Sequence, residues 1–114
     1  MEELKRVSYK VAKALKEAGY PQGNLSVWYD RHGVIFTIRP KEGTEYYVAP
    51  EYLKVWLWLW REKRIFIEIL QNVFGVEMYI WKDYYDNIYK EDCKDPEEAI
   101  IAAIEYIVNN KLLK

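Results

Sequence analysis

The sequence predicts a single α+β domain over residues 1–114, with the element order α-βββ-α-βββ-α and antiparallel hairpins packed against helices. Three observations predict this class. Apolar residues recur at helical spacing near both ends and in the middle of the chain, they alternate with a period of two in the stretches between, and turn residues separate these segments. A chain of 114 residues is also long enough to bury one core.

The first predicted helix covers residues 2–18, where Lys and Glu alternate with a stripe of apolar residues. Gly19 ends it, because glycine readily takes the left-handed conformation after a last turn, and Pro21 cannot continue a helix. The apolar stripe consists of Leu4, Val7, Val11, Ala14, Leu15 and Ala18.

Three short strands are predicted next. Arg31-His32-Gly33 supplies the turn of a hairpin, and residues 44–48 form a third strand after a Pro-Lys-Glu-Gly turn. The side chains predicted to share a face in the two hairpin strands are Leu25, Val27 and Tyr29, and Val34, Phe36 and Ile38.

The second predicted helix runs from Pro50, at the first helical position, to about residue 64 and contains the segment WLWLW. Trp58 falls on its polar side near Lys54 and Arg61, and two interpretations stay open. It packs over the stems of those two cations, or it forms a contact surface together with Val55. The predicted core stripe is Leu53, Trp56, Leu57 and Trp60, widened by Tyr52 and Leu59.

A second hairpin and a last helix complete the chain. Ile65, Ile67 and Ile69 alternate with other residues, a turn follows at residues 72–75, and Val76, Met78 and Ile80 alternate again, with a shorter strand at residues 88–91. A helix then starts with Asp95 as N-cap, Pro96 at its first position and Glu98 reaching back. Its buried stripe is Ile100, Ala103, Ile104, Ile107 and Val108. Residues 24–64 and 65–110 could form a degenerate βββα repeat, or share only ordinary helix-start chemistry.

Charge and cysteine content bound the setting. The net charge is −1, but residues 1–64 hold 12 Lys/Arg and 8 Asp/Glu, net +4, whereas residues 65–114 hold 5 and 10, net −5. Cys93 is the only cysteine, so no intrachain disulfide forms, as is typical of a reducing cytoplasm. No apolar run approaches the roughly 20 residues of a membrane helix. We expect a cytoplasmic protein that does not use a membrane.

The sequence contains no enzyme signature. His32, the single histidine, lies two residues after Asp30 in a predicted turn, where the pair could act as a base but is far more often solvated. One His and one Cys far apart match no zinc spacing, and the glycines stand singly rather than in a phosphate-binding loop. We therefore expect no catalytic residues, no metal and no cofactor.

Two resemblances add to these patterns. The order α-βββ-α of the first 64 residues is similar to that of a double-stranded-RNA-binding domain, but the stretch APEYLK lacks the lysine cluster that this family uses on phosphates. The passages VAPEYLKVWLWLWREKRIFIEI and CKDPEEAIIAAIEYIVNN resemble the small uncharacterised accessory proteins of tailed phages and prophages, which carry an APT…WLREK segment and an …EEALEAA… helix. This resemblance implies an accessory protein acting in the host cytoplasm.

These observations predict a phage-type accessory protein that acts by binding a host or phage protein, or by self-association as a homo-oligomer. The alternative is a nucleic-acid-binding module that uses Arg31, Arg39, Lys41, Arg61, Lys63 and Arg64 on phosphates. A tyrosine-lined pocket for a small ligand is a third class. The predicted binding residues are Trp58, Val55, Tyr79, Trp81, Tyr84 and Tyr85.

Overall fold

The computed structural model describes residues 5–23, 27–83 and 85–113 and confirms the predicted α+β class and the order α-βββ-α-βββ-α. Two three-stranded antiparallel sheets have the orders β2-β1-β3 and β4-β5-β6. The chain divides into two compact units, residues 1–51 and residues 52–113. This boundary precedes the 64/65 boundary of the predicted repeat, so the helix that closes the first βββα stretch belongs to the second unit. A single domain over residues 1–114 stays a prediction.

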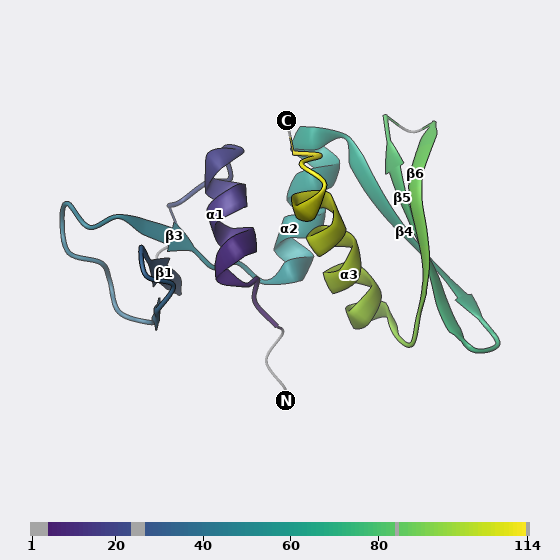
Figure 1. Ribbon diagram of the computed structural model, residues 1–114, viewed down its shortest axis with the longest axis horizontal. Helices are drawn as coiled ribbons and strands as arrows, with labels where there is room; N and C mark the ends of the chain where they lie inside the picture. Colours follow the sequence, from purple (N-terminus) through teal and green to yellow (C-terminus); the bar gives the residue numbers. More distant parts are fainter. Residues whose placement is uncertain (1–4, 24–26, 84, 114) are drawn as a thin grey trace. The chain divides into compact units, whose positions relative to one another are not determined.

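The N-terminal unit contains α1 (Tyr9–Glu17), β1 (Trp28–Asp30), β2 (Ile35–Phe36) and β3 (Tyr46–Val48). Helix α1 packs on β3 (Figure 1). It begins later than predicted, because the Ser8 hydroxyl caps it by accepting from the Val11 N–H. Val7 therefore lies before the helix, and its backbone N–H donates to the Pro50 carbonyl at 3.0 Å. Gly19 has the predicted positive φ, and Leu4 lies outside the described residues.

The buried side chain of β1 is not one of those predicted to share a face. Trp28 is the buried residue of β1 and pairs with Phe36, whereas Val27 and Tyr29 are half-buried. The strand is apolar on both faces, and the larger indole takes the core side because it removes more apolar area from water. Phe36 lies on the same face as Trp28, whereas Val34 and Ile38 lie outside β2 and are exposed. Leu25 lies outside the described residues.

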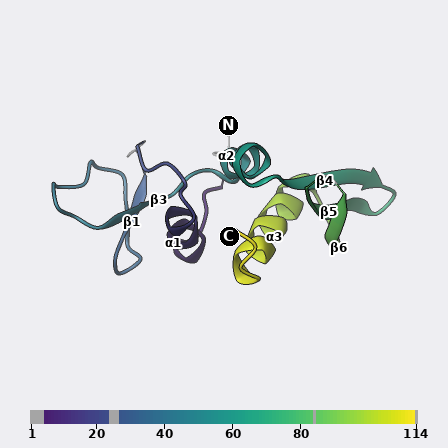
Figure 2. The same cartoon turned by 90° about the horizontal axis from the view of Figure 1, so that it is seen from above.

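The C-terminal unit contains α2 (Tyr52–Trp58), the π-helix η1 (Leu59–Lys63), β4 (Ile65–Asn72), β5 (Gly75–Lys82), β6 (Asp86–Cys93) and α3 (Pro96–Asn109). Helix α3 packs on one face of the sheet β4-β5-β6 and also on α2 (Figures 1 and 2). The Asp95 carboxylate accepts from the Glu98 N–H at 2.9 Å, so the predicted N-cap is confirmed. Strand β6 is longer at both ends than predicted.

The predicted core of this unit is largely confirmed. The five predicted apolar residues of α3 are all buried, as are Val76, Met78 and Ile80 on β5. On β4, Ile65 and Ile67 are buried and Ile69 is half-buried. One apolar stripe on α3 therefore meets one apolar face of the sheet.

The predicted buried face of the helix that α2 and η1 form is wrong in part. Tyr52 and Leu59 are buried as predicted, and Trp56 is half-buried. Val55 is also buried, whereas Leu53, Leu57 and Trp60 are exposed by 39%, 47% and 51%. Apolar residues cover most of this helix, so helical periodicity is satisfied by two different stripes. Packing against α3 favours the stripe that begins at Tyr52, which is also the first helical residue, two positions after Pro50.

Among the residues that the structure describes, no helix combines the length and the apolar character that a transmembrane segment needs.

Candidate functional site

The sheet β4-β5-β6 has one face covered by α3 and an opposite face that we call the outer face. Because directly paired residues of antiparallel strands project to the same face, the register identifies the side chains that share it. Phe66 pairs with Trp81, and Tyr79 lies between Glu68 on β4 and Lys90 on β6. The outer face therefore carries three aromatic rings among charged residues.

These aromatic side chains are held by neighbours on the same face. The Tyr79 and Trp81 rings stack, with centroids 6.3 Å apart and planes inclined by 27°. The indole N–H of Trp81 donates to Glu68 Oε1 at 3.3 Å, and the Tyr79 hydroxyl donates to Glu77 Oε2 at 2.8 Å. The hydrogen bond to Glu77 raises the pKa of the Tyr79 hydroxyl. Both aromatic side chains are thus fixed in orientation.

An exposed stripe that runs from α2 into η1 continues this surface. Leu53, Leu57 and Trp60 lie on one side of the helix, at positions three or four residues apart. The Trp60 ring meets the Phe66 ring edge to face, with centroids 6.1 Å apart and planes inclined by 75°. This contact joins the helix to the outer face of the sheet. We call the joined surface the apolar band, which consists of Leu53, Leu57, Trp60, Phe66, Tyr79 and Trp81.

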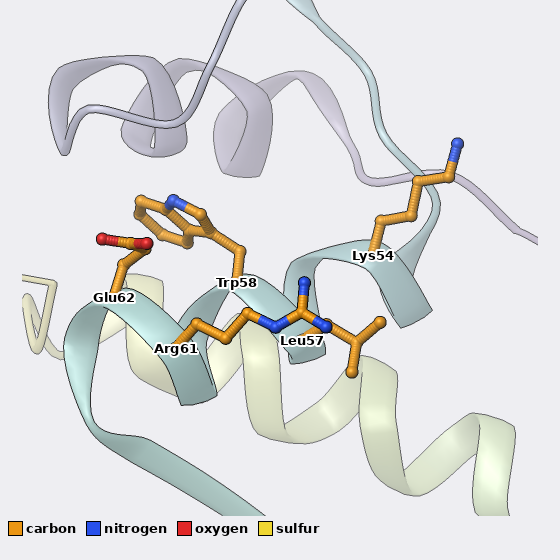
Figure 3. Close-up of a pocket in the computed structure, with 5 residues that line it drawn as sticks. All are labelled: Lys54, Leu57, Trp58, Arg61 and Glu62. Atoms are coloured by element: carbon orange, nitrogen blue, oxygen red, sulfur yellow. The ribbon is translucent and has the colours of Figure 1, made fainter.

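Trp58 lies in a different environment. Its ring lines a shallow cavity of about 270 Å³ together with Leu57 and three charged side chains. Figure 3 shows the ring next to the Glu62 carboxylate, while the Arg61 side chain extends toward Leu57. Lys63 Nζ lies 5.4 Å from the ring centroid, a cation–π contact. A cation therefore packs over the Trp58 ring, and Lys63 supplies it. The charged lining residues are Lys54, Arg61 and Glu62.

The structure brings together only part of the predicted site. Tyr79 and Trp81 are neighbours on the outer face, and Tyr85 is 86% exposed beyond the end of β5. Val55 was predicted beside Trp58 on a contact surface, but it is completely buried and cannot contribute to one. Its position three residues after Tyr52 places it on the buried stripe of α2. Tyr84 lies outside the described residues.

Several apolar residues of the surface are not predicted from the sequence. The helical pattern predicts Leu53, Leu57 and Trp60 in the core, and it gives no role to Phe66, which is half-buried in the structure. At the β4–β5 turn, Val73 and Phe74 are 93% and 96% exposed. The composition of that turn was an available signal, because apolar residues are unusual where glycine, asparagine and aspartate prevail.

The Asp30 carboxylate holds the turn that contains His32. Asp30 Oδ1 accepts from the backbone N–H groups of His32 and Val34, at 2.8 and 3.0 Å, which makes a turn rather than orienting the imidazole. These two hydrogen bonds, with that of Val34 the larger effect, lower the pKa of Asp30. Across residues 5–23, 27–83 and 85–113, no three His, Cys, Asp or Glu side chains gather as metal ligands would.

Cys93 is expected to be unreactive in the folded protein. The residue is only 9% exposed, and burial, with the nearby Glu91 carboxylate, raises the pKa of its thiol to about 11. Since the thiolate is the nucleophile, a disulfide reagent should label Cys93 at neutral pH far more slowly than in urea-unfolded protein. Equal labelling rates for the native and the unfolded protein, measured by absorbance of the released thiolate, would contradict this expectation.

Comparisons with protein-family models, with curated proteins and with solved structures found no significant match to this chain.

Proposed function

We propose that this chain is a protein-binding module and that the apolar band is its contact surface. The observation that carries the proposal is the Trp60–Phe66 contact, which joins an exposed helix stripe to the outer face of the sheet, where Phe66, Tyr79 and Trp81 are half-buried. Aromatic residues within an apolar patch, with charged residues around them, are the composition typical of protein interfaces. Glu68, Glu77 and Lys90 supply those charges. The resemblance to phage and prophage accessory proteins supports a host or phage protein as partner.

The proposal is tested by capture of a partner with variants from both parts of the apolar band. Tagged protein would be exposed to nuclease-treated host lysate, and the dominant retained protein would be identified and its affinity measured with purified components. Leu57→Ser on α2 and Trp81→Ala on β5 should each weaken binding by about tenfold or more, because contact residues of this kind contribute about 1.4 kcal/mol or more.

Tyr85→Ala is the matched control, since Tyr85 is exposed but lies outside the apolar band. Its affinity should equal that of the unchanged protein, and all three variants should retain their melting temperatures to within a few degrees. Loss of binding in the Tyr85 variant alone, or unaltered binding in both band variants, would contradict the proposal.

The nucleic-acid alternative has less support from the contacts of its six basic residues. Arg64 Nε lies 3.2 Å from Asp83 Oδ1, and Lys63 lies over the Trp58 ring. Both are thus engaged within the C-terminal unit. Arg31, Arg39 and Lys41 belong to the other compact unit. Nucleic-acid binding would appear in the same experiment as nuclease-sensitive absorbance and as an affinity that falls steeply with salt.

A further inference from the structure

Strand β4 is a free edge strand of the C-terminal sheet. In the order β4-β5-β6, β4 has one neighbour, and among the described strands none pairs with its other side (Figure 2). The Arg64 carbonyl accepts from the Asp83 N–H at 3.0 Å, so this pair is of the hydrogen-bonded type. Such pairs alternate along an antiparallel ladder without register shifts. The backbone N–H and C=O groups of Ile65, Ile67 and Ile69 therefore point toward the free edge.

The two edges of this sheet differ in how well they are protected from pairing with another strand. Strand β6 carries four charged residues in eight, and a bulge interrupts its pairing with β5 between Ile80 and Trp81. Charged side chains and β-bulges prevent an edge strand from pairing with another strand. Strand β4 carries a single charge in eight residues, Glu68, and its ladder with β5 is regular. The unprotected edge of the sheet is therefore β4.

From this unprotected edge we infer that two copies of the chain associate through β4, with the two β4 strands paired antiparallel about a two-fold axis. A second copy fits because the strand is self-complementary. The isoleucines of the inner face, which is the face covered by α3, would meet the same isoleucines of the other copy. Ile69, which is only half-buried, would be covered by Ile65 of the other copy. The two sheets would join into one of six strands. This inference does not rest on the proposed partner-binding function.

Glu68 determines the register of this pairing. An axis through Glu68 would place the two carboxylates directly opposite each other, which is destabilising. An axis through Ile69 would place the inner-face Ile67 opposite Gln71. An axis through Ile67 instead pairs Ile67 with itself, Ile65 with Ile69 and Phe66 with Glu68. An axis through Phe66 avoids both conflicts, but it pairs only residues 65–67 of the two strands and leaves Ile69 opposite Lys63, which precedes the strand. The Ile67 register avoids both conflicts and also covers Ile69 with an isoleucine.

The Ile67 register is tested by two substitutions at one position that differ in the sign of their charge. Phe66→Lys would place a cation opposite Glu68 of the other copy, and Phe66→Glu would place an anion there. Sedimentation equilibrium of the full chain should show a dimer for the unchanged protein and for Phe66→Lys. Phe66→Glu should raise the dimer dissociation constant by at least about tenfold, because two like-charge pairs form per dimer. Adding Glu68→Lys to Phe66→Glu should restore the dimer.

Both variants lose the same phenylalanine, so a change in folding or in the apolar band affects them alike, and circular dichroism would confirm that both are folded. A monomer at the highest soluble concentration of the unchanged protein overturns the inference. A dimer that responds equally to both charges overturns it as well. Partner capture by Leu57→Ser and Trp81→Ala is measured separately, so failure of the dimer and failure of the proposed function are distinguishable.

Discussion

Replacement of Trp28 by alanine is expected to destabilise the N-terminal unit by about 3–5 kcal/mol, the range found for removal of a buried aromatic side chain. Trp28 is 5% exposed. Its ring stacks on Phe36 at 4.7 Å and meets Tyr46 at 6.2 Å with an interplanar angle of 71°. Its indole N–H donates to the Ile38 carbonyl. One side chain thus connects β1 to residues of both neighbouring strands.

The size of this effect follows from the weakness of the sheet itself. The strands of this unit contain three, two and three residues, so few ladder hydrogen bonds hold them together. A sheet this small depends on packing of its side chains. The aromatic cluster around Trp28 supplies such packing across all three strands.

Amide hydrogen exchange measures the consequence for each unit. Protection in Trp28→Ala should fall for residues 27–51, while strands β4 and β5 keep theirs. Ile38→Ala is the control, because Ile38 is apolar but 67% exposed, and such substitutions change stability by about 0.5 kcal/mol or less. An equal loss of protection in β4 and β5 would show that the two units do not unfold separately.

The parts of the fold that the sequence predicts correctly are those with a single apolar stripe. Helix α3 has one apolar side and a polar remainder, and its start is marked by Asp95 and Pro96. Strand β5 alternates Val76, Met78 and Ile80 with residues of a different character. In such segments only one orientation buries the apolar residues, so pattern and tertiary structure agree.

The parts that the sequence predicts wrongly are apolar on more than one side. In α2, both the stripe that contains Tyr52 and the stripe that contains Leu53 have helical spacing, and contact with α3 decides between them. In β1, Trp28 lies between two other apolar residues, and only its pairing with Phe36 reveals the buried face. Local periodicity does not contain this information, because the choice depends on residues distant in the chain.

The same reason explains why most of the candidate site was missed. Tyr79 and Trp81 can be predicted, because they alternate with Val76, Met78 and Ile80 and so lie on the other face of the strand. Trp60 and Phe66 cannot, because the apolar band exists only once α2 presents its second apolar stripe to the surface. An aromatic residue in a helix that is apolar all round therefore carries little information about function until the buried side of that helix is known.

Replacement of Gly75 by alanine is expected to destabilise the C-terminal unit by about 2–5 kcal/mol, the combined range for a strained backbone and an overpacked position. Gly75 has a φ of +152°, which residues with a side chain rarely adopt. A Cβ at this position would lie 2.4 Å from the Cys93 carbonyl oxygen and 3.0 Å from that of Lys94. Both obstacles are backbone atoms, at the junction of β6 and α3, so relief requires movement of the strand itself.

Gly43→Ala separates the two causes, because Gly43 has a φ of +83° but no atom within 4 Å of the position of an added Cβ. That variant tests backbone strain alone and should cost about 1–2 kcal/mol. Urea unfolding followed by circular dichroism, with amide exchange to assign each loss to its unit, measures both. If Gly75→Ala cost no more than Gly43→Ala, close approach of β5 to the end of β6 would not be what requires glycine there. A larger loss, confined to residues 52–113, is the result that this close approach predicts.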